Sequence, residues 1–141
     1  GVAGMGGLAM RGKCLCGEVA FDCDVAPVVT VACHCTHCQK TSGGAFSVNA
    51  IVPGAAFRLT GGYAVYADQG ESGGAVERCF CPKCGSPLAS RLGNGMVAVK
   101  VGALESDEDV TPALQVWTRS ARPWSKSLLA APGFETNPPS A

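Results

Sequence analysis

The segment C-H-C-T-H-C, residues 33–38, constrains this chain most, because it places three thiols within six residues. The C-x-C-x-x-C spacing is typical of metal ligands, since one short loop can aim several sulfurs at a single ion. We expect the chain to fold back at His34 so that the three sulfurs converge. Three thiolates leave one position of a tetrahedral zinc ion open, which is typical of a catalytic site. Alternatively, a histidine of the segment or a distant cysteine fills that position.

The nine cysteines of the chain indicate metal binding rather than a disulfide framework. Their spacings are too tight for ordinary disulfides, and an odd number would leave one thiol unpaired in a secreted protein. We therefore expect a cytoplasmic protein, in a reducing compartment, whose thiols are held as thiolates by metal.

Composition excludes several classes of partner. The net charge is zero and only 16% of the residues are charged, which argues against a broad surface for nucleic acid or acidic lipid. The apolar runs are too short to span a membrane, and the first ten residues lack the order of charges of a secretory signal. We expect a disordered tail or cloning remnant over residues 1–11, a single zinc-binding β domain over 12–130, and an irregular C-terminal tail over 131–141.

Alternating apolar and polar residues predict a mainly β fold with very little helix. In residues 18–25, for example, Val19, Phe21 and Cys23 fall on one face of a strand. The Gly93-Asn94-Gly95 sequence predicts a hairpin. Further strands are predicted over 28–31, 45–52, 57–59, 75–80, 87–92, 96–101 and 113–118, and one helical turn over 39–42. We count seven or eight short strands separated by glycine turns, which is typical of an all-β domain.

Two more cysteine pairs lie far apart in the sequence, and each pair is followed by glycine. Cys14 and Cys16 lack two ligands, as do Cys81 and Cys84. Joined, they make a closed four-thiolate site, which is typically structural. The three cysteines of residues 33–38 are then left as a separate, open site.

The remaining cysteines, Cys23 and Cys79, lie on predicted strands. A free cysteine on a strand usually packs as a small apolar side chain. We interpret both as packed residues rather than ligands, although Cys79 could be a spare ligand because it lies two residues before Cys81.

Three motifs together carry a family resemblance. They are G-x-C-L-C-G at residues 12–17, C-H-C-x-x-C-Q-K-x-x-G at 33–43, and F-C-x-x-C-G-S-P-L at 80–88. In order and spacing the chain resembles the glutathione-dependent formaldehyde-activating enzyme family, which also includes centromere protein V, from about Gly12 to Trp124. The resemblance implies twisted antiparallel sheets pinned by zinc, an arrangement called a β-tent.

The resemblance also implies two zinc sites. The structural zinc would be held by Cys14, Cys16, Cys81 and Cys84, and a catalytic, more labile zinc by Cys33, Cys35 and Cys38. The activity of the family is the addition of glutathione to formaldehyde, which gives S-hydroxymethylglutathione and is classed as a carbon–sulfur lyase reaction in reverse.

We therefore expect a zinc-dependent carbon–sulfur lyase-type enzyme. It would activate glutathione or a similar thiol for reversible addition to formaldehyde or another small aldehyde. The expected catalytic residues are Cys33, Cys35, Cys38 and His34, and either His34 or His37 could transfer the proton. A small thiol and a small aldehyde are the expected partners, with no membrane or nucleic-acid partner.

Two other function classes remain open from the sequence. A non-catalytic zinc module for protein or chromatin interaction would be favoured by a fourth protein ligand on the second metal. A thiol redox protein would be favoured by a disulfide between Cys35 and Cys38, which form a C-x-x-C pair.

Overall fold

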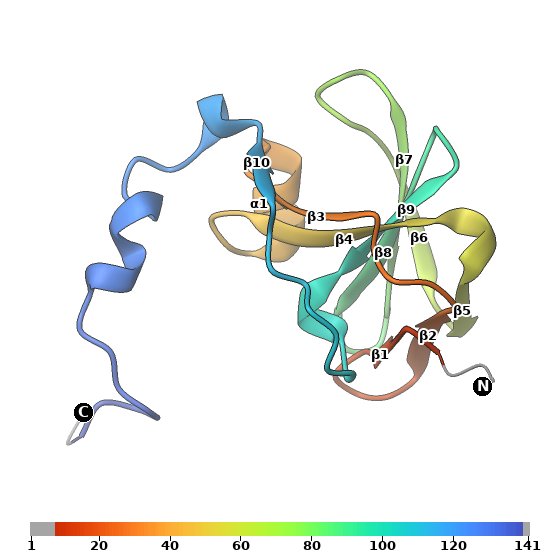
Figure 1. Cartoon of the computed structure of the whole chain (residues 1–141), viewed down its shortest axis with the longest axis horizontal. Helices are drawn as coiled ribbons and strands as arrows, with labels where there is room; N and C mark the ends of the chain where they lie inside the picture. The colour runs from red at the N-terminus through yellow and green to blue at the C-terminus, as the bar shows by residue number, and fades with distance from the viewer. Residues whose placement is uncertain (1–7, 140–141) are drawn as a thin grey trace.

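Two β-sheets organise the protein, as Figure 1 shows for the computed structural model, which describes residues 8–139. The smaller sheet has the strand order β1-β2-β5 and the larger one the order β10-β3-β4-β9-β8-β7-β6. The mainly β fold predicted from the sequence is thereby confirmed. The strands are β1 (Met10–Lys13), β2 (Val19–Cys23), β3 (Val29–Cys33), β4 (Ser47–Pro53), β5 (Phe57–Gly61), β6 (Ala64–Gln69), β7 (Ala75–Phe80), β8 (Pro87–Leu92), β9 (Met96–Lys100) and β10 (Leu114–Val116).

Helical structure is limited in the described part of the chain. The α-helix α1 (Thr36–Ser42) follows β3 and begins directly after Cys35. It ends at Gly43, whose positive φ of 70° is a conformation that glycine adopts without strain. Short 3₁₀ helices are η1 (Gly54–Ala56), η2 (Val101–Ala103), η3 (Thr118–Ser120) and η4 (Ser125–Ala130).

Strand β1 was not expected from the sequence. It forms because it pairs with β2, where Met10 lies opposite Cys23, and the side chain of Met10 is fully buried. The sheet therefore starts at Met10, ahead of the expected domain boundary at residue 12. Residues 1–7 of the expected N-terminal tail, and residues 140–141 of the C-terminal tail, lie outside the described residues.

One strand pair departs from the expected antiparallel arrangement. Strand β10 pairs with β3 in parallel, with Val116 opposite Cys33. The long connection between β9 and β10 allows this, because parallel neighbours need a crossover rather than a hairpin. As a result, the end of β10 lies directly beside the start of the C-H-C-T-H-C segment, and His34 N donates a hydrogen bond to Val116 O at 3.0 Å.

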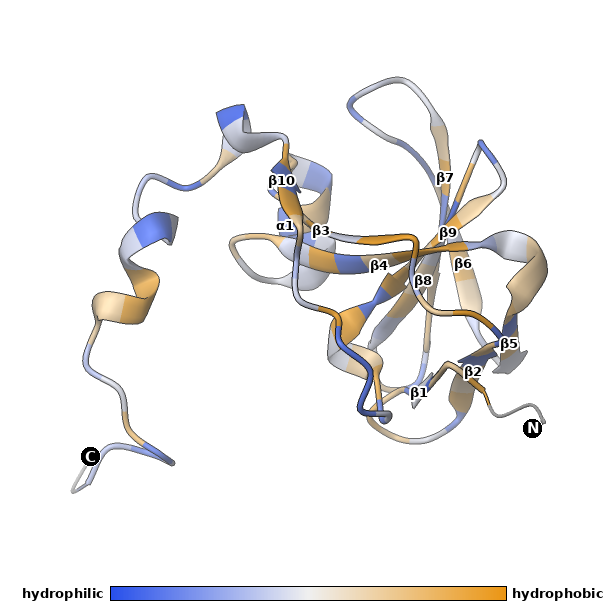
Figure 2. Cartoon of the chain, viewed as in Figure 1, coloured by the Kyte–Doolittle hydropathy of each residue, from blue (hydrophilic) through white to orange (hydrophobic). Residues whose placement is uncertain are grey.

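The two faces of the larger sheet differ in character, and Figure 2 shows both hydrophobic and hydrophilic residues along its strands. On one face, residues such as Ala50, Val52 and Val99 join the buried core against the smaller sheet. Residues directly opposite in neighbouring strands share a face. The strand register therefore gathers on the other face, called the polar face below, the residues Cys33, Ser47, Asn49, Lys100, Ser90 and Arg78.

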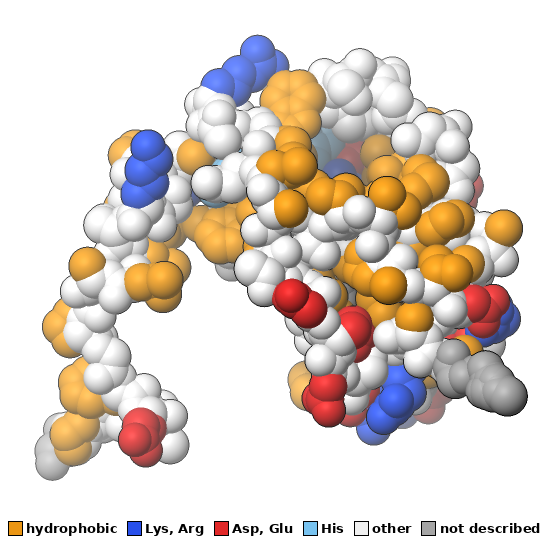
Figure 3. Space-filling model, in the orientation of Figure 1, with side chains coloured by type: hydrophobic (Ala, Val, Ile, Leu, Met, Phe, Trp, Pro, Cys, Tyr) orange, Lys and Arg blue, Asp and Glu red, His pale blue; other side chains and the backbone are white. Residues whose placement is uncertain are grey.

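The last part of the described chain leaves the sheets as an extended arm (Figure 1). It contains η3 and η4, and several apolar side chains along it are exposed, as Figure 3 shows. Among residues 8–139, no helix is long and apolar enough to cross a membrane.

Candidate functional site

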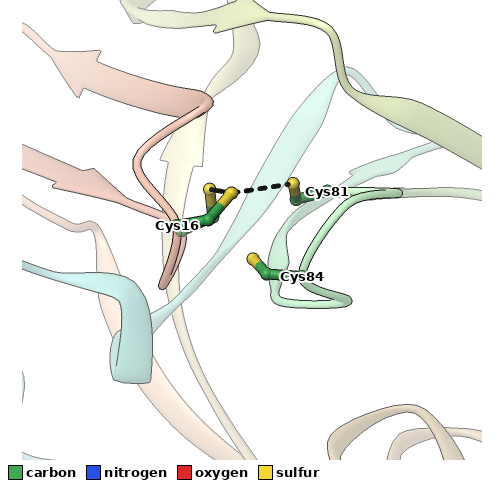
Figure 4. Close-up of side chains that lie close together, drawn as sticks. Cys16, Cys81 and Cys84 are labelled. Atoms are coloured by element: carbon green, nitrogen blue, oxygen red, sulfur yellow. Dashed lines mark hydrogen bonds between the residues drawn. The ribbon is translucent and has the colours of Figure 1, made fainter.

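The first group of cysteines joins the two sheets. Cys14 and Cys16 lie in the loop between β1 and β2, and Cys81 and Cys84 lie in the loop between β7 and β8. All four sulfurs lie within 4.8 Å of one another. Figure 4 shows Cys16 facing Cys81 and Cys84 across the space between the two loops. The structure thus brings together the four cysteines that the sequence analysis paired.

The backbone conformation and the hydrogen bonds around these cysteines suit metal binding. Gly85 follows the second pair with a φ of 82°, a conformation that side-chain-bearing residues rarely adopt. Val19 N donates to Cys14 Sγ at 3.3 Å. The pKa of Cys84 is lowered to about 5, chiefly because Ser86 donates hydrogen bonds to its sulfur. Four converging sulfur donors fit a closed tetrahedral zinc site.

The second group of cysteines lies where β3 meets α1. Cys33 ends β3, Cys35 caps the helix, and Cys38 lies in its first turn. Their sulfurs also lie within 4.8 Å of one another, and Cys38 N donates to Cys35 Sγ at 3.2 Å. Within residues 8–139, no further histidine, cysteine or carboxylate joins this group at that distance. The donor set fits a metal ion with one position open to an exchangeable ligand.

Electrostatics favours a thiolate in this second group. The pKa of Cys38 is lowered to about 5, chiefly because Cys33 donates a hydrogen bond to its sulfur, and burial opposes this effect. The cations Lys100 and Arg78 lower the same pKa through smaller electrostatic contributions. The pKa of Cys33 is raised in turn, because its protonated thiol donates the hydrogen bond to Cys38 and because its side chain is buried. One thiolate in this group is therefore favoured even before a metal binds.

His34, one of the expected catalytic residues, is turned toward β10. Its Nε2 lies 2.8 Å from Gln115 Oε1, and its ring packs against Phe46 at a centroid distance of 5.3 Å. The side chain is buried, and its Nδ1 has no hydrogen-bond partner among the described residues. The structure does not include His34 in either group of potential metal ligands.

His37 belongs to a charged cluster that sequence reasoning missed. Its Nδ1 lies 2.8 Å from Asp68 Oδ2, which also accepts a hydrogen bond from Arg78 Nε at 2.8 Å. Hydrogen bonds from His37 and Arg78 lower the pKa of Asp68 to about 2. Neither Asp68 nor Arg78 stands in a recognisable motif, so only the pairing of β6 with β7 and the placement of α1 reveal this cluster.

Gln39 ties α1 to the C-terminal segment. Its Nε2 donates to His34 O at 2.7 Å and to Ser120 O at 2.9 Å, and its Oε1 accepts from Arg122 Nε at 2.9 Å. Trp117, a few residues before Ser120, packs against the second cysteine group. Trp117 has a φ of 58°, a strained conformation for a residue other than glycine, and strain of this kind often marks a functional position.

Two cavities adjoin the polar face, and both are lined by Lys100, Thr41 and Pro87. The larger has a volume of about 580 Å³ and extends from Ser47 to Cys14. The smaller has a volume of about 180 Å³ and is lined also by Ser90 and other residues of β7 and β8. The larger volume lies within the usual range for small-molecule sites, roughly 300–1,000 Å³.

Cys23 and Cys79 lie outside both cysteine groups. Cys23 is fully buried in the core between the sheets, and Cys79 is buried on β7. Burial raises the pKa of both thiols.

Comparison with known proteins agrees with this arrangement. The fold and the two cysteine groups define a mainly β protein with two candidate metal sites. Residues 9–120 match the family described as "Glutathione-dependent formaldehyde-activating enzyme", and the chain belongs to this family. A search of curated proteins found no match.

A crystal structure of a Rhodobacter sphaeroides protein has a similar fold. Its TM-score is 0.59 at 19% sequence identity, and the alignment covers 75% of this chain and 99% of that chain. The similarity supports the fold. The part of the C-terminal arm after Ser120, which includes η4, lies beyond the segment that matches the family.

Proposed function

We propose that this protein is a carbon–sulfur lyase-type enzyme that activates glutathione or a similar thiol for reversible addition to formaldehyde or another small aldehyde. The observation that carries the proposal is the second cysteine group, with three converging sulfurs and no fourth side-chain ligand within residues 8–139. Membership of the family over residues 9–120 supports the choice of thiol and aldehyde. A fourth protein ligand would instead favour a non-catalytic zinc module.

Zinc is the metal that best fits both donor sets. Sulfur-rich coordination is typical of zinc in proteins. Cys14, Cys16, Cys81 and Cys84 would hold a structural ion that ties the two sheets together. Cys33, Cys35 and Cys38 would hold the second, and a zinc ion bound there would supply a site at which a thiol loses its proton at neutral pH.

The chain's own residues prepare the thiol for attack. The three cysteines are nearly buried, and Val116 and Trp117 pack against them, which limits the access of water. A thiolate in such surroundings is less well solvated, and it keeps its nucleophilicity toward a small carbonyl compound. Trp117 would form one wall for the aldehyde.

A proton must be moved while the carbon–sulfur bond forms. The thiol RSH and formaldehyde together give RS–CH₂–OH, so the proton of the thiol ends on the former carbonyl oxygen. His37 is the candidate for this transfer, because Asp68 hydrogen-bonds its Nδ1 and leaves Nε2 available. Its side chain is 35% exposed, whereas His34 is buried and its Nε2 is bonded to Gln115. We therefore assign the transfer to His37 and a positioning role to His34.

The experiment is to follow the formation of S-hydroxymethylglutathione from ¹³C-formaldehyde and glutathione by NMR, over the uncatalysed background. The zinc-loaded protein should accelerate formation and breakdown equally. Cys35→Ser should abolish the acceleration. His37→Gln should reduce it by about 10²-fold or more, as is typical for loss of a general acid or base. A rate equal to the background for wild-type protein, with every thiol and aldehyde tried, would contradict the proposal.

A further inference from the structure

Lys100 is a buried cation without an acidic partner among the described residues. Its side chain is 8% exposed, yet Nζ contacts only neutral acceptors, Ser47 Oγ at 3.2 Å and Asn49 Oδ1 at 2.8 Å. Arg78 on the same face is buried to a similar degree, but it is paired with Asp68. The nearest anionic group to Lys100 is the thiolate of the second cysteine group, which Lys100 stabilises electrostatically from a distance. No negatively charged group accepts a hydrogen bond from Nζ among the described residues, so an anionic ligand would have a buried charged donor here.

Ser90 provides a second, independent indication of a ligand. Its side chain is 3% exposed, and its Oγ has no hydrogen-bond partner among the described residues. Ser90 and Lys100 both line the cavity of about 180 Å³, and both lie on the polar face. Buried hydroxyl groups are nearly always hydrogen-bonded, so a lone buried hydroxyl at a cavity requires an explanation. A ligand oxygen in the cavity would accept a hydrogen bond from the Ser90 hydroxyl.

Lys100 relates this cavity to the second cysteine group, because its side chain lines both cavities. Its Nζ donates a hydrogen bond to Ser47 Oγ, and Ser47, which lines the larger cavity, lies directly opposite Cys33 across strands β3 and β4. Opposite residues have Cβ atoms roughly 5 Å apart, and neighbouring strands are separated by about 4.8 Å. A ligand whose sulfur lies at the cysteine group and whose anionic group lies at Lys100 therefore needs a span of roughly 5–10 Å.

We propose that the cavity of about 180 Å³ on the polar face binds a carboxylate of the thiol substrate, with Lys100 Nζ and Ser90 Oγ as its hydrogen-bond donors. The proposal rests on the proposed function, because it assigns this carboxylate to the thiol that the second cysteine group receives. Lys100 has a third N–H besides the two that bond Ser47 and Asn49, and it is available for the carboxylate. The enzyme would then select thiols that carry a carboxylate several bonds from the sulfur.

The test uses calorimetric titration of the zinc-loaded full chain with ω-mercaptocarboxylic acids of three to eight carbons. Each acid is compared with its own amide, which has the same length and no charge. At the matching length, the acid should bind about tenfold or more tightly than the amide, as is typical of a charge-assisted hydrogen bond. This comparison needs no variant, so it remains valid even if a substitution impairs folding.

Variants then identify the residues. Lys100→Met should remove the preference for the acid over its own amide. The acid and the amide are compared within the same variant, because Lys100 also acts electrostatically on Cys38. Ser90→Ala should weaken binding of the acid severalfold without lowering the stability of the ligand-free protein, because it removes a hydroxyl that has no partner. Lys13→Met is the matched control, since Lys13 lines only the larger of the two cavities, and it should leave the preference unchanged.

The outcomes separate the two proposals. Equal affinity for acid and amide at every length, or loss of the preference in Lys13→Met but not in Lys100→Met, would overturn the carboxylate site and leave the thiol chemistry intact. Binding of no thiol at all, charged or neutral, would overturn the proposed function and this inference with it.

Discussion

His37 Nδ1 lies 2.8 Å from Asp68 Oδ2, so a residue of the C-H-C-T-H-C segment is oriented by a carboxylate from a strand 31 positions later. Asp68 is itself held by Arg78. The cluster thereby links α1 to β6 and β7, and it sets which nitrogen of the His37 ring faces away from the protein scaffold.

The first prediction concerns the pH dependence of stability. The pKa of Asp68 is about 2 in the folded protein, below the ordinary value of 3.8. A carboxyl group with a lowered folded pKa stabilises the protein above its unfolded pKa, and this stabilisation is lost as the pH falls toward the folded value. Asp68→Asn should therefore lower the free energy of unfolding at pH 7, and the difference from wild type should shrink between about pH 4 and pH 2.

Chemical denaturation at a series of pH values measures this difference. Asp107→Asn is a suitable control, because no hydrogen bond or ion pair to the Asp107 carboxylate occurs among the described residues. A difference between wild type and Asp68→Asn that stays constant down to pH 2 would show that the cluster does not bind the ionised carboxylate.

The second prediction concerns metal content. We expect up to two zinc ions per chain, one for each cysteine group, with the ion of the three-sulfur group more easily removed. Elemental analysis of freshly purified, reduced protein should approach two equivalents, and mild chelation should reduce this to one. Freshly reduced protein without zinc would contradict both sites.

The third prediction separates the roles of the two groups. Cys81→Ser removes a ligand from the group that joins the two sheets, where the free energy of metal binding is also free energy of folding. This variant should be unfolded or insoluble. Cys38→Ser alters a group formed within one short segment, so its thermal unfolding should stay close to that of wild type. Equal loss of stability in both variants would refute this division.

The fourth prediction concerns the contacts of Gln39. Gln39→Leu leaves buried backbone oxygens such as His34 O without this donor, which should lower the free energy of unfolding by about 1–3 kcal/mol. It should also expose the segment after Trp117 to proteolysis. Lys40→Ala, on the exposed side of the same helix, is the control and should change neither property. An unchanged cleavage pattern in Gln39→Leu would show that these hydrogen bonds do not anchor the segment.

Both cysteine groups could be predicted from the sequence because their ligands stand in short, regular spacings. The second group needs only six consecutive residues, and ligand counting was enough to join Cys14 and Cys16 with Cys81 and Cys84. The strands over residues 75–80 and 87–92 were also predicted with their observed limits, because clear turn residues bound them.

The polar face could not be predicted, because it depends on strand order and register. Lys100 ends a strand that otherwise reads as apolar, and only its pairing opposite Asn49 places it near Cys33. Strand β1 was missed because its glycine and charged residues carry little β propensity, so its pairing with β2 decides its conformation. The parallel pairing of β10 with β3 could not be predicted either, because the long crossover that permits it has no recognisable local sequence pattern.

The proposed function requires that an added thiol becomes the fourth ligand of the metal at Cys33, Cys35 and Cys38. Replacing zinc by Co²⁺ makes this visible, because each added thiolate strengthens the sulfur-to-metal charge-transfer absorption. Titration with glutathione should raise this band to saturation, and Cys35→Ser should abolish the rise. A flat titration with every thiol tried would mean that the site is closed by the protein itself, and the protein would then be a non-catalytic metal-binding module.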